Sequence, residues 1–206
     1  MRIITISREF GSGGRELGKR LADEFGFVYY DREIVSAVAE SMDMDEADTK
    51  GLLDHGVSTD VPVTFSRTLS GAAALTVRSS YALGRQNSII KALGAKGDCV
   101  IVGRGADALL REYQPFSVFV YASMASRVER CKARATAEEQ RSDKEWERLI
   151  RSVDRTRAKT YEMISGASWG DMHAYRLCLD ATGTEIRDLI PSVAAYARTW
   201  FEATGQ

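Results

Sequence analysis

The sequence predicts an α/β fold with a parallel sheet, on three observations. Residues Ile3–Asp31 read as a strand, a glycine-rich loop, an amphipathic helix and a second strand. Short apolar runs typical of buried strands recur at Val100–Val102, Val118–Ala122 and Leu177–Leu179, with helical patterns between them. Strands that alternate with helices favour βαβ units, in which neighbouring strands run parallel.

The first of these units is the most informative part of the chain. Ile3, Ile4 and Ile6 form a β-branched apolar run, and Ser7–Gly14 is a loop with three glycines in four positions. The next segment, Glu16–Phe25, has the apolar period of a helix. A short second strand is expected to end near Asp31.

This loop is expected to bind phosphate. Glycines let backbone N–H groups converge on an anion, and the start of the following helix adds its positive dipole end. A simple tight turn is the alternative, but it does not require two serines and two arginines beside the glycines. The candidate phosphate-binding residues are Ser7, Arg8, Gly11, Ser12, Gly13, Gly14, Arg15 and Glu16.

The loop departs from the pattern G-x-x-x-x-G-K-[ST]. Arg8 stands at the first glycine position and Gly14 at the lysine position. Arg15 follows and offers a planar fork of donors for phosphate where lysine would offer a point charge. Mg²⁺ would need a carboxylate, Glu9 or Glu16, or binding mainly by the nucleotide and water.

These residues resemble a known family. The string ISREFGSGGRELGKRLADEFGFVYYDRE, residues 6–33, is similar to the opening of the cytidylate kinase-like family, a branch of the P-loop nucleoside monophosphate kinases. The resemblance continues in the expected order through CVIVGRGADALL, FVYASMASRVERC, DRTRAKTY, SWGD and AYRLCLD. It therefore spans nearly the whole chain.

The resemblance implies a three-layer α/β/α P-loop NTPase fold that binds ATP at the glycine loop and a nucleoside monophosphate beneath a lid. We expect one cytidylate kinase-like domain over residues 1–206, with a substrate-side helical insertion near 36–95 and a lid region near 127–164. The implied reaction moves the terminal phosphoryl group of ATP to a nucleoside monophosphate, with CMP as a candidate acceptor and Mg²⁺ as cofactor.

The composition limits which other classes of protein the chain can belong to. With 206 residues and 44% hydrophobic content, the chain can bury one substantial core. A net charge of −1 gives no overall attraction to nucleic acid. Cys99, Cys131 and Cys178 are too scattered for a disulfide frame or a zinc site. With neither a signal peptide nor a membrane span in the pattern, we expect a cytoplasmic protein; the oligomeric state stays open.

Candidates for binding the acceptor lie at a strand end and on a helix. Val100–Val102 ends at Gly103-Arg104-Gly105, and open parallel sheets bind ligands at the carboxyl ends of strands, so Arg104 is the leading candidate. Arg78 and Arg85 lie a heptad apart on a predicted helix, where a solvated face is an equal alternative. The acceptor-side candidates are Asp31, Arg32, Arg78, Arg85 and Arg104.

Further arginines are expected around the triphosphate. Ser123 or Ser126 can cap the helix that carries Arg127, Arg130 and Arg134 on one face. Similar kinases place arginines here; solubility is the alternative for the whole face, and the role of Arg134 stays open. The catalytic candidates, which include the loop and the helix described next, are Arg15, Arg127, Arg130 and Arg157.

A long helix is predicted over 143–164. Its apolar stripe includes Trp146, Ile150 and Tyr161, and Arg157 projects with that stripe. Burying a guanidinium is costly unless it meets an anion, so Arg157 is expected to face a phosphate or to pair with Asp154. The opposite stripe, a solvated face by default, consists of Arg148, Arg151, Arg155 and Lys159.

Two other classes of function are weighed against the kinase. A nucleotide-binding sensor without turnover is the main alternative, because the loop lysine is missing. Nucleic-acid binding through the basic stripe is disfavoured, because no aromatic side chains are interleaved with it. A serine or cysteine hydrolase is also disfavoured, since neither His55 nor His173 has the surroundings of a catalytic triad.

Overall fold

The computed structural model describes the backbone of residues 1–55 and 69–206 and the side chains of residues 1–53 and 77–206. The chain divides into two compact units. The first comprises residues 1–31 and 93–206, and the second comprises residues 32–92. Each unit is described by itself below. Within the described residues, no helix has the length and apolar character needed to span a membrane.

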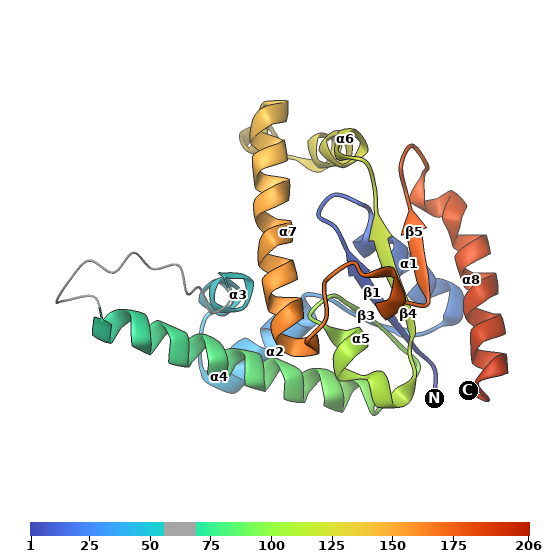
Figure 1. Cartoon of the computed structure of the whole chain (residues 1–206), viewed down its shortest axis with the longest axis horizontal. Coiled ribbons are helices and arrows are strands. Elements are labelled where there is room, and N and C mark those ends of the chain that lie inside the picture. Colours follow the sequence, from blue (N-terminus) through green and yellow to red (C-terminus); the bar gives the residue numbers. More distant parts are fainter. Residues whose placement is uncertain (56–68) are drawn as a thin grey trace. The chain divides into compact units, whose positions relative to one another are not determined.

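The first unit is built on a five-stranded parallel sheet (Figure 1). The spatial order is β2-β3-β1-β4-β5, so β1 lies at the centre and its Ile6 pairs with Val102 on one side and Val118 on the other. The parallel α/β fold expected from the sequence is confirmed. The strands are β1 (Ile3–Arg8), β2 (Val28–Tyr30), β3 (Cys99–Val102), β4 (Phe116–Tyr121) and β5 (Leu177–Asp180).

Helices cover both faces of this sheet, which gives the expected three layers (Figure 1). On one face, α1 (Gly14–Phe25) and α8 (Ile186–Ala203) pack together over the central strands. On the other face lie α5 (Ala106–Leu109) and α7 (Asp143–Ser165). The remaining elements of the unit are α6 (Met124–Arg134) and three 3₁₀ turns at Arg111–Tyr113, Ala137–Glu139 and Met172–Ala174.

Side-chain alternation along the strands explains how the core is divided. Ile4 and Ile6 of β1 belong to the main core with Leu17 of α1. Phe119 of β4 points to the opposite face and packs with Tyr161 and the other aromatic side chains there. Successive residues of a strand point to opposite faces of the sheet, so both layers of helices are held by the same strands.

The second unit is helical over its described part, and its assignment as a substrate-side insertion stays a prediction. It contains α2 (Glu33–Met42), α3 (Glu46–His55) and most of α4 (Leu69–Gly94). Its small core is formed by Val35, Val38, Leu53, Ala82 and Leu83. Residues 56–68 of the expected insertion lie outside the described residues.

Candidate phosphate-binding site

The loop between β1 and α1 has a backbone that only glycine adopts easily. Gly11 has φ 81° and Gly13 has φ 92°, both in the left-handed region. A Cβ at Gly13 would lie 2.4 Å from Cδ1 of Ile186, so close packing also excludes a side chain there. The helix begins at Gly14, two residues earlier than the predicted Glu16, because the helical turn starts inside the glycine run.

Several N–H groups of this loop have no acceptor within the protein. Gly13 occupies the N-cap position of α1, and no side chain caps the helix. Among the described residues, no carbonyl or carboxylate accepts from the N–H groups of Gly11, Gly13, Gly14 or Arg15. Unpaired N–H groups at a helix N-terminus form an anion-binding site.

These groups border a cavity of about 390 Å³. This volume lies within the usual size range of small-molecule sites, about 300–1,000 Å³. Basic side chains reach its wall from β1, α1, α6, the α6–α7 connection and α7. They are Arg8, Arg15, Arg130, Arg134, Arg141 and Arg157.

Arg8 is the most unusual of these cations. Its side chain is only 14% exposed, and its nearest carboxylate oxygen is Oδ1 of Asp31 at 3.8 Å. Burial lowers the pKa of Arg8 well below its ordinary value, and the charges of Arg157, Arg104 and Arg15 lower this pKa further against the favourable effect of Asp31. Since arginine stays protonated in proteins, this site carries positive charge that an anion would stabilise.

The room for this guanidinium comes from the end of β3. A Cβ at Gly103 would lie 1.6 Å from Nη1 of Arg8, so the guanidinium could not keep this position if residue 103 carried a side chain. The next residue, Arg104, has φ 60° and is half-buried. Asp31 also pairs with Arg15, whose Nε lies 2.5 Å from Oδ2. Four predicted site residues, Arg8, Arg15, Asp31 and Arg104, are therefore neighbours.

Arg157 joins this group from α7. Its Nη1 donates to the backbone carbonyl of Arg8 at 3.0 Å and lies 3.8 Å from Oδ1 of Asp154. The guanidinium carbon is 5.5 Å from the ring centroid of Phe10, a cation–π distance. Arg157 therefore pairs with Asp154 and also lines the cavity, and its contact with a phosphate stays a prediction.

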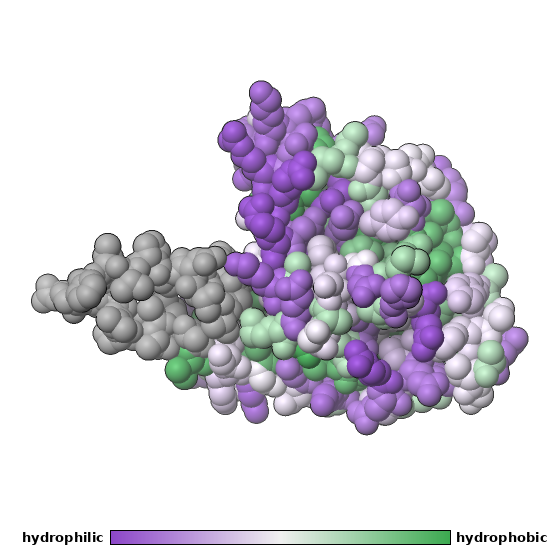
Figure 2. Space-filling view, in the orientation of Figure 1, coloured by the Kyte–Doolittle hydropathy of each residue, from purple (hydrophilic) through white to green (hydrophobic). Residues whose placement is uncertain are grey.

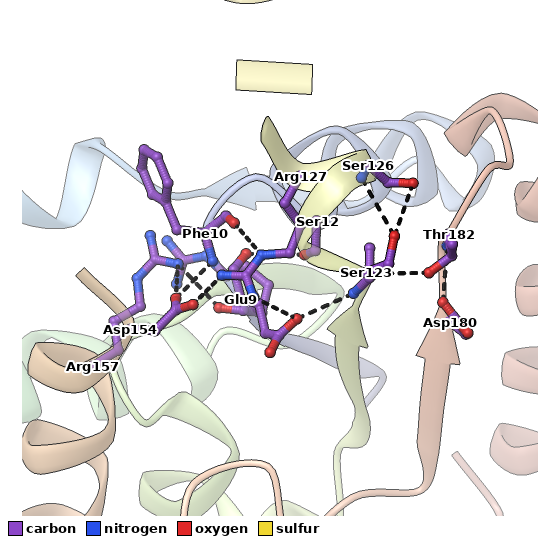
Figure 3. Close-up of polar contacts among 12 residues, drawn as sticks. Glu9, Phe10, Ser12, Ser123, Ser126, Arg127, Asp154, Arg157, Asp180 and Thr182 are labelled. Atoms are coloured by element: carbon purple, nitrogen blue, oxygen red, sulfur yellow. Dashed lines mark hydrogen bonds and ion pairs between the residues drawn. The ribbon is translucent and has the colours of Figure 1, made fainter. Parts of the chain in front are cut away.

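Arg127, a residue of α6, holds the backbone and a carboxylate of the loop through hydrogen bonds and ion pairs (Figure 3). Its Nε donates to the carbonyl of Phe10 at 2.8 Å, and Nη1 lies 3.1 Å from Oε2 of Glu9. Its Nη2 pairs with Asp154, whose Oδ1 accepts the N–H of Phe10 at 2.8 Å. Arg127 is 5% exposed and does not line the cavity, so its contacts are with the loop backbone and two carboxylates.

Two other arginines of α6, Arg130 and Arg134, bind groups beside the loop. Arg130 donates to the carbonyls of Ala181 and Thr184 and, at 3.5 Å, to that of Ser12. Arg134 pairs with Glu16 at 2.6 Å. Ser123 is the N-cap of this helix and accepts from the N–H of Ser126 (Figure 3), which decides between the two predicted caps.

The two carboxylates expected to bind Mg²⁺ are both held by protein groups. Glu9 accepts from the N–H of Ala122 at 3.1 Å and pairs with Arg127. Burial raises the pKa of Glu9, and those two contacts oppose that shift. Glu16 is shared by Arg20 and Arg134. No group of three potential metal ligands occurs among the described residues, so these side chains do not fit a protein-built metal site.

The other acceptor-side candidates belong to the second unit. Arg32 precedes α2, and Arg78 and Arg85 lie on the exposed side of α4. Within that unit, Arg78 lies 3.5 Å from the sulfur of Met44, and Nε of Arg85 donates to Ser41 at 3.4 Å. Their part in binding an acceptor stays a prediction.

The basic stripe of α7 is solvent-exposed. Arg148, Arg151, Arg155 and Lys159 are all exposed, and Figure 2 shows hydrophilic surface over the upper part of this helix. The solvated-face interpretation therefore agrees with their position.

Sequence reasoning missed two polar residues beside the loop. Asp107 of α5 is 8% exposed and accepts hydrogen bonds from Ser7 and Tyr161. Tyr161 was expected only to pack in the core. The available signal was a carboxylate inside the otherwise apolar run Ala106–Leu110, close behind the Gly-Arg-Gly turn.

Comparisons with solved structures show the same fold. An uncharacterised protein from Eubacterium ventriosum superposes with a TM-score of 0.67 at 22% identity, covering 96% of this chain and 99% of its own. Shikimate kinase from Bacteroides thetaiotaomicron gives 0.58 at 14%, covering 98% of each chain. A gluconokinase from Sinorhizobium meliloti gives 0.52 at 17%, covering 98% and 95%.

Sequence comparison places the chain more specifically. No curated protein matches it. The family model described as the cytidylate kinase-like family matches residues 3–183, most of the chain. This match includes the glycine loop, the Gly-Arg-Gly turn and the arginines of α6 and α7. The chain therefore belongs to the cytidylate kinase-like family.

Proposed function

We propose that this protein transfers the terminal phosphoryl group of ATP to a nucleoside monophosphate, with CMP as the first candidate acceptor. One observation carries the proposal: the N–H groups of Gly11, Gly13, Gly14 and Arg15 have no acceptor among the described residues and lie beside a cavity lined with arginines. A triphosphate supplies both the acceptor atoms and the negative charge that this arrangement requires.

The reaction makes few chemical demands on the side chains. A phosphate oxygen of the acceptor forms a bond to the γ-phosphorus, the bond from that phosphorus to the β–γ bridging oxygen breaks, and ADP leaves. Such transfer depends mainly on alignment and on stabilising negative charge. Mg²⁺, when bound with the nucleotide, supplies further charge neutralisation.

We assign separate roles to the arginines that reach the cavity. The loop N–H groups hold the donor phosphates, Arg15 neutralises the outer phosphates, and Arg8 and Arg157 act on the transferring group. Arg104 would seat the acceptor phosphate beside Asp31. Each role requires a contact with phosphate and is a proposal.

Arg127 and Arg130 receive a different role from the one first expected. The nitrogens of Arg127 are engaged by Phe10, Glu9 and Asp154, and those of Arg130 by backbone carbonyls. We therefore propose that both arginines position the loop and the α6 helix and do not themselves touch phosphate. Asp154 contributes to the same positioning.

The test is a direct assay. Purified protein is incubated with Mg-ATP and each common nucleoside monophosphate in turn, and ADP and the matching diphosphate are measured. The proposal expects both products in equal amounts with at least one acceptor. ATP binding without turnover on every acceptor would contradict it and would support the nucleotide sensor.

A matched pair of variants makes the assay specific. Arg15 and Arg198 are 52% and 49% exposed, and each pairs with one carboxylate at 2.5 Å. Arg15→Ala should lower kcat/KM about 100-fold or more, by analogy with removal of one transition-state donor. Arg198→Ala removes a similar ion pair on α8 and should leave kcat/KM within about twofold of wild type. Equal effects would contradict the role given to Arg15.

A further inference from the structure

Helix α7 contacts the phosphate loop along one of its faces. Asp154 accepts the N–H of Phe10 at 2.8 Å, and one turn later Arg157 donates to the carbonyl of Arg8 at 3.0 Å. Residues spaced three and four apart share a helix face, so Tyr161 is the next member of this row. Residue numbers rise along α7 from Asp154 to Arg157, whereas those of their partners in the loop fall from Phe10 to Arg8.

The third contact continues this row to Ser7, through Asp107. The hydroxyl of Tyr161 donates to Oδ2 of Asp107 at 2.7 Å. The hydroxyl of Ser7 donates to Oδ1 of the same carboxylate at 3.2 Å. Tyr161, Asp107 and Ser7 are 4%, 8% and 4% exposed, respectively. The end of β1 is thus linked to α7 by one buried carboxylate with a hydrogen bond on each oxygen.

Burying the carboxylate of Asp107 costs free energy, so packing alone does not explain why an aspartate stands at this position. A buried carboxylate is destabilising unless it is fully hydrogen-bonded, and an apolar side chain would fill the same space without that cost. Burial raises the pKa of Asp107, and the hydrogen bonds from Tyr161 and Ser7 partly oppose the shift. Hydrogen bonds with fixed directions, unlike apolar contacts, set the rotation and height of a helix.

We propose that Asp107 and Tyr161 are positioning residues that fix the register of α7 against the end of β1 and thereby place Arg157 over the phosphate loop. Arg157 lies four residues before Tyr161, so a rotation of the helix would displace its guanidinium from the carbonyl of Arg8. This inference rests on the proposed function for its kinetic consequence. Its structural consequence, a loop held in place by α7, stands without it.

Two variants and a matched control test the proposal. Tyr161→Phe removes only the hydroxyl, and Asp107→Asn keeps the shape but disturbs the pairing. Tyr196→Phe is the control, because it also removes only a hydroxyl, from a ring of α8 that packs edge-to-face on Phe116 with centroids 5.3 Å apart, on the other face of the sheet from α7. We expect Tyr161→Phe to lower kcat about tenfold with KM changed less than threefold, since small misplacements of catalytic groups are costly. Tyr196→Phe should match wild type.

A double-mutant cycle separates positioning from general packing. If Tyr161 acts through Arg157, then adding Tyr161→Phe to the Arg157→Ala variant should lower kcat by less than twofold further. An equal tenfold loss in both backgrounds would overturn the proposal. Equal losses for Tyr161→Phe and Tyr196→Phe would do the same, because they would indicate a general effect of removing a tyrosine hydroxyl.

Hydrogen exchange gives a result that does not depend on turnover. In the unliganded protein, peptides covering residues 7–14 should exchange at least threefold faster in Tyr161→Phe and Asp107→Asn than in Tyr196→Phe, while peptides from the middle of α1 stay unchanged. Uniform exchange across these variants would overturn the inference even in an active enzyme. If no acceptor supports turnover but this pattern is found, the proposed function fails while the positioning role stands.

Discussion

The N–H of Phe10 donates a hydrogen bond to the carboxylate of Asp154 over 2.8 Å, although 144 residues separate them in the chain. The same carboxylate pairs with Arg127 of α6. A side chain on α7 therefore satisfies one backbone group of the glycine loop and one buried cation together (Figure 3). The loop keeps its shape through contacts that lie outside the loop.

Asp154→Asn should destabilise the protein substantially. The amide oxygen can still accept from Phe10, but the buried Arg127 loses a compensating charge, which typically costs about 3 kcal/mol. Asp23→Asn is the control, since Asp23 forms an exposed pair with Lys19 whose loss costs about 0.5 kcal/mol. Urea denaturation of both variants measures the difference. Similar free energies of unfolding would show that the Arg127 pair contributes little.

Gly13→Ala should impair both folding and nucleotide binding. The added methyl group meets Ile186 at 2.4 Å and the residue keeps a left-handed φ. Gly26→Ala shares the left-handed φ but meets no atom within 4 Å, so it isolates the backbone cost of about 1 kcal/mol. Calorimetry with a non-hydrolysable ATP analogue should show at least tenfold weaker binding for Gly13→Ala and unchanged binding for Gly26→Ala. Unchanged affinity in Gly13→Ala would contradict the role of the loop.

Arg8→Met should separate stability from binding. The Arg8 guanidinium is buried among like charges, so replacing it by an apolar side chain of similar length should leave the unliganded protein as stable or about 1 kcal/mol more stable. The same change should weaken binding of the ATP analogue by about tenfold or more, since one charge-assisted contact is lost. Denaturation and calorimetry on one sample give both quantities. A loss of stability above about 2 kcal/mol would show that the protein itself already compensates this charge.

The raised pKa of Asp107 predicts a pH dependence of stability with a definite sign. An unfolded aspartate titrates near pH 4, about its ordinary value, whereas the folded form keeps its proton to higher pH. The free energy of unfolding therefore falls as pH rises from about 4 through the raised pKa. Asp107→Asn removes this titration, so wild type should lose stability relative to the variant over that interval. A difference that stays constant from pH 4 to 7 would show that the pKa of Asp107 is not raised.

Local patterns were sufficient to predict most of the first unit. The β-branched run at Ile3–Ile6, the glycine run and the period of α1 are each determined by neighbouring residues. Within the helical region expected near 36–95, the bounds of α3 could not be predicted, because Glu46–His55 is mostly polar and acidic and its buried described residues are only Thr49 and Leu53. A helix with so narrow an apolar stripe gives almost no periodic signal.

The site residues also differ in how well the neighbouring sequence predicts their position. Arg8 and Arg15 lie beside the glycines, so their position at the wall of the cavity follows from the local sequence. The helical period put Arg127 and Arg130 on one face of α6 but could not distinguish a side chain that reaches into the cavity from one that braces the loop. Asp107 escaped notice because its partners, Ser7 and Tyr161, are 100 and 54 residues away.

The central claim is that the loop N–H groups and the arginines around them hold a polyphosphate. The most direct measurement is a two-dimensional NMR titration of isotope-labelled protein with a non-hydrolysable ATP analogue. Our account predicts that the backbone amide signals of Gly11, Gly13, Gly14 and Arg15 shift most, and that Arg8→Met weakens the interaction without moving its location. Binding whose largest shifts lie elsewhere, with these four amides unchanged, would contradict it.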